Sequence, residues 1–224
     1  MQKKLYSAGA TELIKWAASA ISQRSPVLDV GCGRGYLAAA ASNCEIHGLE
    51  PDKERAQDAR RSCERVYEQD IDSFLEEHQQ KALFDAVVCI DLLEHLVSPE
   101  STLVKMRTIL KPQGVLVTAI PNVAHVSSRI RVAKGEWRYA DEGLLDRTHL
   151  RFYTYYTAIE LVRSSGYEVL SVGTIETFPR LVRPIRSLLR GRWPNLFGRH
   201  TLVTARVSSI GPESEAIDRQ AGSF

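Results

Sequence analysis

The sequence predicts an α/β fold: a doubly wound, mostly parallel sheet of seven strands with helices on both faces. The first observation is a series of short apolar runs separated by amphipathic or alanine-rich segments, the alternation expected of parallel β-α units. Five such strands precede Pro121, at residues 26–30, 45–49, 65–68, 84–90 and 115–120. The second observation is that the pattern returns near the C-terminus, with a helix at 154–165 and strands at 167–176 and 200–208.

Start and stop signals bound the helices between these strands. Asp52 is a plausible N-cap for one helix, and a Ser-Pro pair predicts the start of another over residues 98–110. Residues 111–114 then read as a turn before the fifth strand. Apolar residues at helical spacing cover 9–23, and 36–42 is rich in alanine, so both are predicted helices.

The length of 224 residues favours a single domain, which we expect over residues 1–208. Residues 122–152 interrupt the alternation without a clear strand and are too long for an idle connection, so they are the predicted substrate region. Residues 178–199 form a second insertion, which is basic and amphipathic. Residues 209–224 are predicted to form a flexible tail.

The overall composition excludes several classes of protein. A net charge of +2 gives no global reason to expect a nucleic-acid partner. The four cysteines show no C-x-x-C or zinc spacing, which predicts reduced thiols. No signal peptide and no run of 18 apolar residues is visible, so a cytoplasmic protein is expected.

The first strand leads directly into a glycine-rich loop. Gly31, Gly33 and Gly35 are spaced so that a dinucleotide fingerprint, which needs its third glycine one place later, is not matched. Asp29 stands two residues before the loop, where its charge would repel a diphosphate and attract an ammonium group. Glu50 ends the second strand, where a carboxylate can accept hydrogen bonds from ribose hydroxyls. The loop therefore favours a cationic nucleoside amino acid as ligand.

The segment from Leu28 to Gly35 resembles the glycine-rich motif of class I S-adenosylmethionine-dependent methyltransferases. Glu50, Asp70-Ile71, the run from Phe84 to His95 and the turn at 110–114 resemble the later motifs in order. The resemblance implies a Rossmann-like fold and S-adenosylmethionine as cofactor, with S-adenosylhomocysteine as product. The residues expected to contact the cofactor are Asp29, Gly31, Cys32, Gly33, Gly35, Tyr36, Glu50, Pro51, Asp70, Ile71, Ile90, Asp91, Leu92 and His95.

The insertion at 122–152 supplies the candidate catalytic residues. If this stretch is locally helical, Asp146 and His149 share one face, so that Asp146 orients His149 as a general base. Arg151 is a candidate for holding an anionic acceptor. The alternative is a structural network, in which Asp146 caps a turn and His149 bonds a backbone carbonyl.

The run from Pro121 to His125, together with the Asp-Arg-Thr-His-Leu-Arg-Phe run at 146–152, is similar to a bacterial methyltransferase subgroup associated with polysaccharide or cell-surface glycan biosynthesis. This resemblance implies a sugar or glycolipid hydroxyl as acceptor. Asn122 is then a candidate substrate-binding residue, and His125 is a second candidate base.

Asp91, Glu94 and His95 also have the chemistry of metal ligands. A helix start that touches the cofactor is the favoured interpretation, so no metal is predicted. The residues after the fourth strand read Ile-Asp-Leu-Leu, without the Pro-Pro-aromatic run of adenine N-methyltransferases, which argues against a nucleic-acid base as acceptor.

Six arginines interleave with apolar residues within 178–199. Such a segment can lie on an anionic membrane surface, which would place the protein at the inner membrane face. It can also bind a phosphate-bearing acceptor. The alternative is a helix that covers the active site with its arginines in solvent.

The leading hypothesis is O-methylation of a small molecule or of a sugar or glycolipid hydroxyl. N- or C-methylation in the same pocket, a non-catalytic cofactor-binding scaffold and an RNA methyltransferase using the arginine segment are the alternatives. The sequence identifies neither the acceptor nor the oligomeric state.

Overall fold

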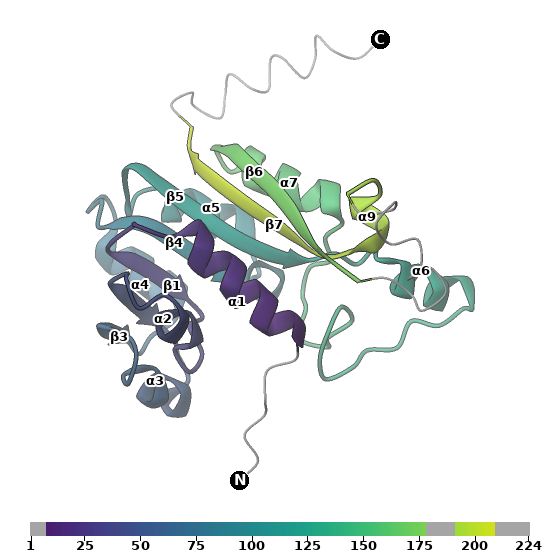
Figure 1. The fold of residues 1–224 in the computed structure, drawn as a ribbon, viewed down its shortest axis with the longest axis horizontal. Coiled ribbons are helices and arrows are strands. Elements are labelled where there is room, and N and C mark those ends of the chain that lie inside the picture. The colour runs from purple at the N-terminus through teal and green to yellow at the C-terminus, as the bar shows by residue number, and fades with distance from the viewer. Residues whose placement is uncertain (1–7, 178–190, 209–224) are drawn as a thin grey trace.

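A computed structural model describes residues 8–177 and 191–208 of the chain. Seven strands form one sheet in the order β3-β2-β1-β4-β5-β7-β6, and β7 runs antiparallel to both of its neighbours. The predicted mostly parallel, seven-stranded sheet is therefore confirmed (Figure 1). The strands are β1 (Val27–Val30), β2 (Ile46–Leu49), β3 (Arg65–Tyr67), β4 (Phe84–Ile90), β5 (Leu110–Pro121), β6 (Tyr167–Glu176) and β7 (Gly198–Val207).

Helices cover both faces of this sheet, and the alternation of side chains along each strand explains why. Along β4, Val87 and Cys89 belong to one apolar cluster, whereas Ala86 and Val88 belong to another on the opposite face. The first cluster includes α4 (Ile71–His78), α5 (Pro99–Met106) and α7 (Tyr155–Ser164); the second includes α1 (Ala8–Ala20), α2 (Tyr36–Ala40) and α3 (Lys53–Ala59). Figure 1 looks onto the face that α1 crosses.

Of the two helix starts read from the sequence, Asp52 caps its helix with a side-chain hydrogen bond, whereas Ser98 precedes α5 without one. The Asp52 carboxylate accepts a hydrogen bond from the backbone N–H of Arg55 and so caps α3. Thr154 caps α7, in a reciprocal box with Thr157. The prediction of a helix over 98–110 was too long, because α5 ends at Met106 and Leu110 already pairs with Phe84 in the sheet.

The predicted turn at 111–114 lies inside β5 as an irregularity. The register moves from Phe84↔Leu110 to Ala86↔Val115, which leaves these four residues outside the paired ladder. Gln113 there has a positive φ of 69°.

Two helices were missed in the sequence. Asp70 caps α4 through the backbone N–H of Ser73, and His125 caps α6 (Val126–Ala133) through that of Ser127. The remaining short helices are η1 (Leu93–His95) and α9 (Pro194–Phe197). The predicted local helix at 146–149 is wrong, because these residues form a turn.

Part of the predicted basic insertion, residues 178–190, and the predicted tail lie outside the described residues. Residues 191–199 are described, and they hold α9 and the start of β7. Within residues 8–177 and 191–208, no helix has both the length and the apolar character needed to cross a bilayer.

Gly35 and Gly135 offer a matched test of how tightly the glycine loop packs. Both have a positive φ, of 79° and 74°. A Cβ on Gly35 would lie 3.0 Å from the Ala59 Cα atom, whereas one on Gly135 would meet no atom within 4 Å. We expect Gly135→Ala to lower the free energy of unfolding by about 1 kcal/mol through backbone strain alone, and Gly35→Ala by about 3 kcal/mol because α3 must also move. Urea denaturation measures both, and equal losses would contradict this packing.

Candidate active site

A cavity of about 210 Å³ opens at the carboxyl ends of β1, β2 and β4. This is the edge at which open α/β sheets bind ligands, because the loops that follow neighbouring parallel strands diverge there. Its lining residues are Leu13, Ile14, Asp29, Gly31, Cys32, Gly33, Tyr36, Glu50, Arg55, Ile90 and Asp91.

The glycine loop is held over the sheet by backbone contacts. Gly31 and Gly33 have positive φ values of 72° and 56°, which a residue with a side chain adopts only with strain. The Gly31 N–H donates to the Leu49 carbonyl at 2.8 Å, and the Gly33 N–H donates to the Glu50 carboxylate at 2.9 Å. Glu50 also accepts from the Asp52 N–H at 3.1 Å. Glu50 is therefore fixed by two backbone donors at the end of β2.

Asp29 is a buried carboxyl group beside this loop. Its side chain is 5% exposed, and burial raises its pKa to about 7, with a smaller contribution from the charge of Glu50. Within residues 8–177 and 191–208, no hydrogen bond to the Asp29 carboxylate compensates for the cost of burying its charge. An incoming cation would stabilise the ionised form of Asp29.

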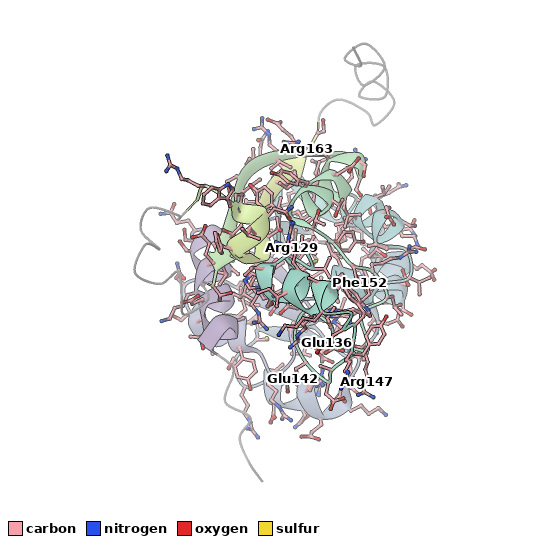
Figure 2. The ribbon with its side chains drawn as sticks, turned by 90° about the vertical axis from the view of Figure 1, so that its right-hand side faces the viewer. Arg129, Glu136, Glu142, Arg147, Phe152 and Arg163 are labelled. Carbon is pink, nitrogen blue, oxygen red and sulfur yellow. The ribbon has the colours of Figure 1, made fainter. Side chains whose placement is uncertain are left out.

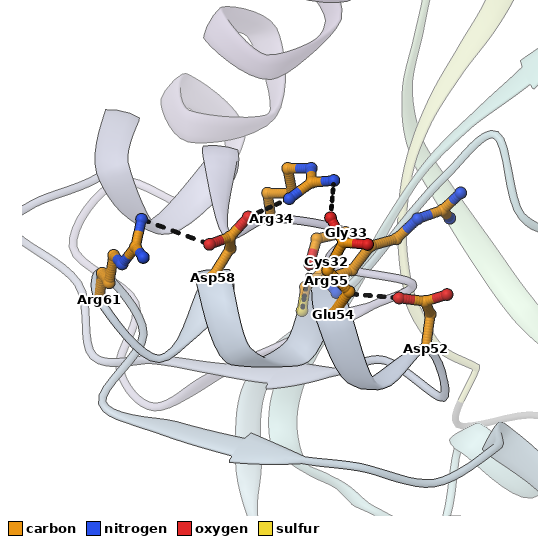
Figure 3. Close-up of polar contacts among 8 residues, drawn as sticks. All are labelled: Cys32, Gly33, Arg34, Asp52, Glu54, Arg55, Asp58 and Arg61. Carbon is orange, nitrogen blue, oxygen red and sulfur yellow. Dashed lines mark hydrogen bonds and ion pairs between the residues drawn. The ribbon is translucent and has the colours of Figure 1, made fainter. Parts of the chain in front are cut away.

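Arg34, the cation of the glycine loop, is drawn away from the cavity. Its guanidinium pairs with Glu54 at 2.8 Å and with Asp58, both on α3 (Figure 3). Arg55 carries the positive charge among the lining residues, against the three carboxyl groups of Asp29, Glu50 and Asp91. The cavity is thus built to receive positive charge.

Three lining residues were not among the predicted site residues. Leu13 and Ile14 reach the cavity from α1, and Arg55 reaches it from α3. His200 contacts Asp91 with its Nε2 atom 3.1 Å from the carboxylate. It does so because β7 pairs antiparallel with β5, which sets His200 opposite Pro121.

The remaining predicted cofactor residues are not among the lining residues of the cavity: Gly35, Pro51, Asp70, Ile71, Leu92 and His95. Leu92 packs against the glycine loop, since a Cβ on Gly31 would lie 3.4 Å from its Cδ1 atom. The Asp70 carboxylate is used at the start of α4, where it accepts from the backbone N–H and the hydroxyl of Ser73.

His125 serves as a helix cap. Its Nδ1 atom accepts from the Ser127 N–H at 3.2 Å, so the proton resides on Nε2, which donates to the Thr177 carbonyl at 3.2 Å. Burial lowers the pKa of this imidazole. Both nitrogens are engaged with the protein, which leaves neither free to take a proton from an acceptor.

The turn at 146–149 has the contacts of a structural network, in which Asp146 caps the turn and His149 bonds a backbone carbonyl. Asp146 accepts from the N–H and the hydroxyl of Thr148, at 2.8 and 2.6 Å. Although partial burial opposes it, these hydrogen bonds lower the pKa of Asp146. The Leu144 carbonyl accepts a hydrogen bond from the His149 imidazole, whose pKa is lowered by burial and by the neighbouring His95.

His149 faces Glu94, a residue that was not among the predicted catalytic groups. Its Nε2 atom lies 3.9 Å from the Glu94 carboxylate, and the two side chains are 6% and 2% exposed. The His95 ring contacts the His149 ring edge to face, with centroids 4.8 Å apart. Burial, followed by the charge of Asp91, raises the pKa of Glu94 well above its usual range. Asp91 connects this cluster to the cavity.

The two predicted substrate-binding residues, Asn122 and Arg151, donate side-chain hydrogen bonds to backbone carbonyls. The Asn122 amide donates to the carbonyls of Asn195 and Gly198, at 3.1 and 2.7 Å, and Arg151 donates to the Val97 carbonyl at 2.8 Å. Figure 2 shows the face of the molecule on which the labelled residues of the 122–152 segment gather, from Arg129 to Phe152.

Comparison with known proteins identifies relatives of this domain. A family model described as a methyltransferase domain matches residues 1–172. The ubiquinone biosynthesis O-methyltransferase of Vibrio atlanticus is 37% identical over 94 residues, which cover 39% of this chain and 40% of that protein. The chain spans less than half of the length of the first curated relatives that it matches.

Solved structures share the fold at low identity. A SAM-dependent methyltransferase from Archaeoglobus fulgidus is 19% identical, with a TM-score of 0.61 over 87% of this chain and 93% of that one. The [4+2]-cyclase SpnF is 17% identical, with a TM-score of 0.60 over 94% and 86%. Since the second is named for a different reaction, the fold alone does not decide the chemistry.

The buried carboxyl group of Asp29 predicts a pH-dependent stability difference. A folded pKa of about 7, above the ordinary value of 3.8, means that its contribution to stability is present at low pH and lost as pH rises through 7. We expect Asp29→Asn to be more stable than the wild type at pH 8, by up to about 4 kcal/mol, with the difference shrinking towards pH 4. Urea denaturation across this range, with the exposed Glu136→Gln as control, measures it; a difference that grows as pH falls would contradict the assignment.

Proposed function

The chain belongs to the methyltransferase domain family, and on this premise we propose that the protein transfers the methyl group of S-adenosylmethionine to a hydroxyl oxygen of a small acceptor. The observation that carries the proposal is the acidic cavity at the carboxyl ends of β1, β2 and β4. The O-methyltransferase names of the curated relatives support oxygen as the atom that is methylated.

The cavity has the donor set that this cofactor needs. Asp29 offers a buried carboxylate for the α-ammonium group, and Glu50, already oriented by two backbone donors, offers its remaining lone pairs to the ribose hydroxyls. At Gly33 a Cβ would meet nothing within 4 Å, so the loop leaves open space for a ligand. A diphosphate would meet three carboxyl groups here and is disfavoured.

The reaction needs few catalytic groups from the protein. The cofactor, when bound, supplies a methyl group on a positively charged sulfur. In the transfer, the acceptor oxygen forms a bond to the methyl carbon, the sulfur–methyl bond breaks with its electrons going to sulfur, and the hydroxyl proton leaves. Asp29 and Glu50 orient the donor, and the cluster around His149 and Glu94, reached through Asp91, is placed to promote proton loss.

The proposed acceptor class is a sugar or glycolipid hydroxyl, on the resemblance of the 121–125 and 146–152 runs. The names of the curated relatives add a hydroxyl group of an intermediate of ubiquinone biosynthesis as the second candidate. Both acceptors are alcohols or phenols, so the same proton must be lost in either case.

Cofactor binding tests the first half of the proposal. We expect Asp29→Ala and Glu50→Gln each to weaken the binding of S-adenosylhomocysteine by about 10- to 100-fold, because each removes a hydrogen bond to a charged group. Titration calorimetry measures the affinity, with the exposed Glu64→Gln as a control that removes the same charge. Unchanged affinity in both variants would reject the site.

Methyl transfer tests the second half. The protein is incubated with S-adenosylmethionine labelled in its methyl group and with a panel of sugars, glycolipids, phenols and amines. We expect label in a methoxy group of a sugar or phenol product, identified by mass spectrometry and carbon NMR. Label attached to nitrogen or carbon would overturn the proposed oxygen acceptor, and tight cofactor binding without transfer to any member would favour a non-catalytic scaffold.

A further inference from the structure

Three potential metal ligands meet beside the cavity, although they come from two distant segments. Glu94 and His95 lie in η1, directly after β4, and His149 lies in the turn of the 122–152 segment. One ligand atom from each of the three falls within 4.8 Å of the others. The N–H groups of Leu150 and Arg151 donate to the Glu94 carbonyl, at 2.8 and 3.0 Å, and so tie the two segments together.

The Glu94 side chain is buried without a partner. The residue is 1% exposed, and among residues 8–177 and 191–208 neither of its carboxylate oxygens has a hydrogen-bond partner. Burying a carboxylate without a partner is destabilising, as is removing one partner of a buried ion pair. Protonation would remove the charge but would leave the carboxyl group without a hydrogen-bond partner, because His149 Nε2, at 3.9 Å, is beyond hydrogen-bond distance. The pair therefore leaves room for a further group between the two side chains.

Each imidazole contributes one nitrogen to this cluster of ligand atoms. His95 Nδ1 lies 3.1 Å from the Thr148 carbonyl, which must accept, so that nitrogen carries the proton and Nε2 keeps a free lone pair. The Leu144 carbonyl accepts from the His149 ring, whose Nε2 atom faces Glu94. Imidazoles that bind metal ions are oriented in this way, by a carbonyl on the other nitrogen.

The hydrogen bonds of the turn at 146–149 support this arrangement. Asp146 accepts from both the N–H and the hydroxyl of Thr148, and the carbonyl and hydroxyl oxygens of Thr148 lie 3.1 and 3.2 Å from His95 Nδ1. Asp146 thus acts on His95 through Thr148 and not as the direct orienter of His149. The acidic residue of the 146–152 run supports the ring of the neighbouring segment.

We propose that Glu94, His95 and His149 bind a divalent first-row transition-metal ion, of which Zn²⁺ is the probe used below. Two imidazoles and one carboxylate form the ligand set of open, catalytic sites, which keep positions for water or substrate. In such sites, ligand atoms lie about 3.3 Å apart, so the three side chains close by a small rotation around the ion. The proposal differs from the expectation, drawn from the sequence, that the protein holds no metal.

The ion would also take part in the proposed methyl transfer, and this consequence rests on the proposed function. A hydroxyl bound to the ion loses its proton more readily, and the ion would hold the acceptor oxygen on the side of the cavity where Asp91 lies. The binding of the ion does not itself depend on methyl transfer, and it is measured separately.

Titration of the metal-free full chain tests the proposal. We expect calorimetry to show one Zn²⁺ per chain, and Co²⁺ to give the visible absorption of a site with nitrogen and oxygen ligands. Glu94→Gln and His149→Gln should weaken Zn²⁺ binding by more than about 100-fold, and Thr148→Val by about 10- to 100-fold as a supporting residue. His78→Gln is the matched control, because His78 also lies 3.9 Å from a carboxylate, that of the exposed Glu77. The Zn²⁺ affinity of this variant should equal that of the wild type.

Each alternative outcome decides the matter. Equal Zn²⁺ affinity in the wild type and the Glu94 and His149 variants, or no binding at millimolar Zn²⁺, would overturn the site. Circular dichroism and S-adenosylhomocysteine affinity verify that each variant is folded, and Glu94→Gln removes an unpaired charge, so we expect it to keep the fold. Metal binding without methyl transfer would leave the site standing and count against the proposed function, whereas transfer unaffected by chelators in a protein that binds no metal would remove the metal site alone.

Discussion

The hydrogen bond from the Gly33 N–H to the Glu50 carboxylate joins the two parts on which the site depends. It links the loop after β1 to the end of β2, and it exists because parallel pairing brings Val30 and Leu49 side by side. The same register brings Asp29 to the same edge of the sheet, one residue before the strand ends. Two buried carboxyl groups are therefore held close together by the backbone, and their proximity is part of why the pKa of Asp29 is raised. A ligand that brings positive charge relieves this repulsion, which gives the cavity its preference.

Specificity for the acceptor does not come from the sheet. The same fold occurs in a protein named as a [4+2]-cyclase, so the chemistry must lie in what surrounds the cavity. The 122–152 segment is the part of the chain that we propose for this role, and its turn is tied to η1 by two backbone hydrogen bonds to Glu94. The segment thereby carries His149 to a carboxylate that lies 55 positions earlier in the sequence. Proton removal and acceptor binding are both expected on this side of the cavity.

Most of the fold was predictable because its signals are local. The strands β1 and β4 are mostly apolar runs, and the cap of α3 is an aspartate in the expected place. The missed helices α4 and α6 are short; one is capped by an aspartate that had been reserved for the cofactor, and the other by a histidine that had been read as a base. A polar side chain such as Asp70 or His125 can cap a helix or contact a ligand, and the sequence pattern is the same in both cases. Only the backbone groups near the side chain in the folded protein distinguish the two roles.

The sequence by itself determined the α/β class, the acidic glycine loop and the order of the motifs, because each depends on residues that are adjacent or lie along one strand. Only the tertiary structure decided which histidines are engaged and which face a gap. His125 is saturated by Ser127 and Thr177, whereas His149 meets a buried and unpaired Glu94. The physical reason is that hydrogen-bond satisfaction is a property of three-dimensional neighbours, and these come from segments whose separation along the chain carries no signal.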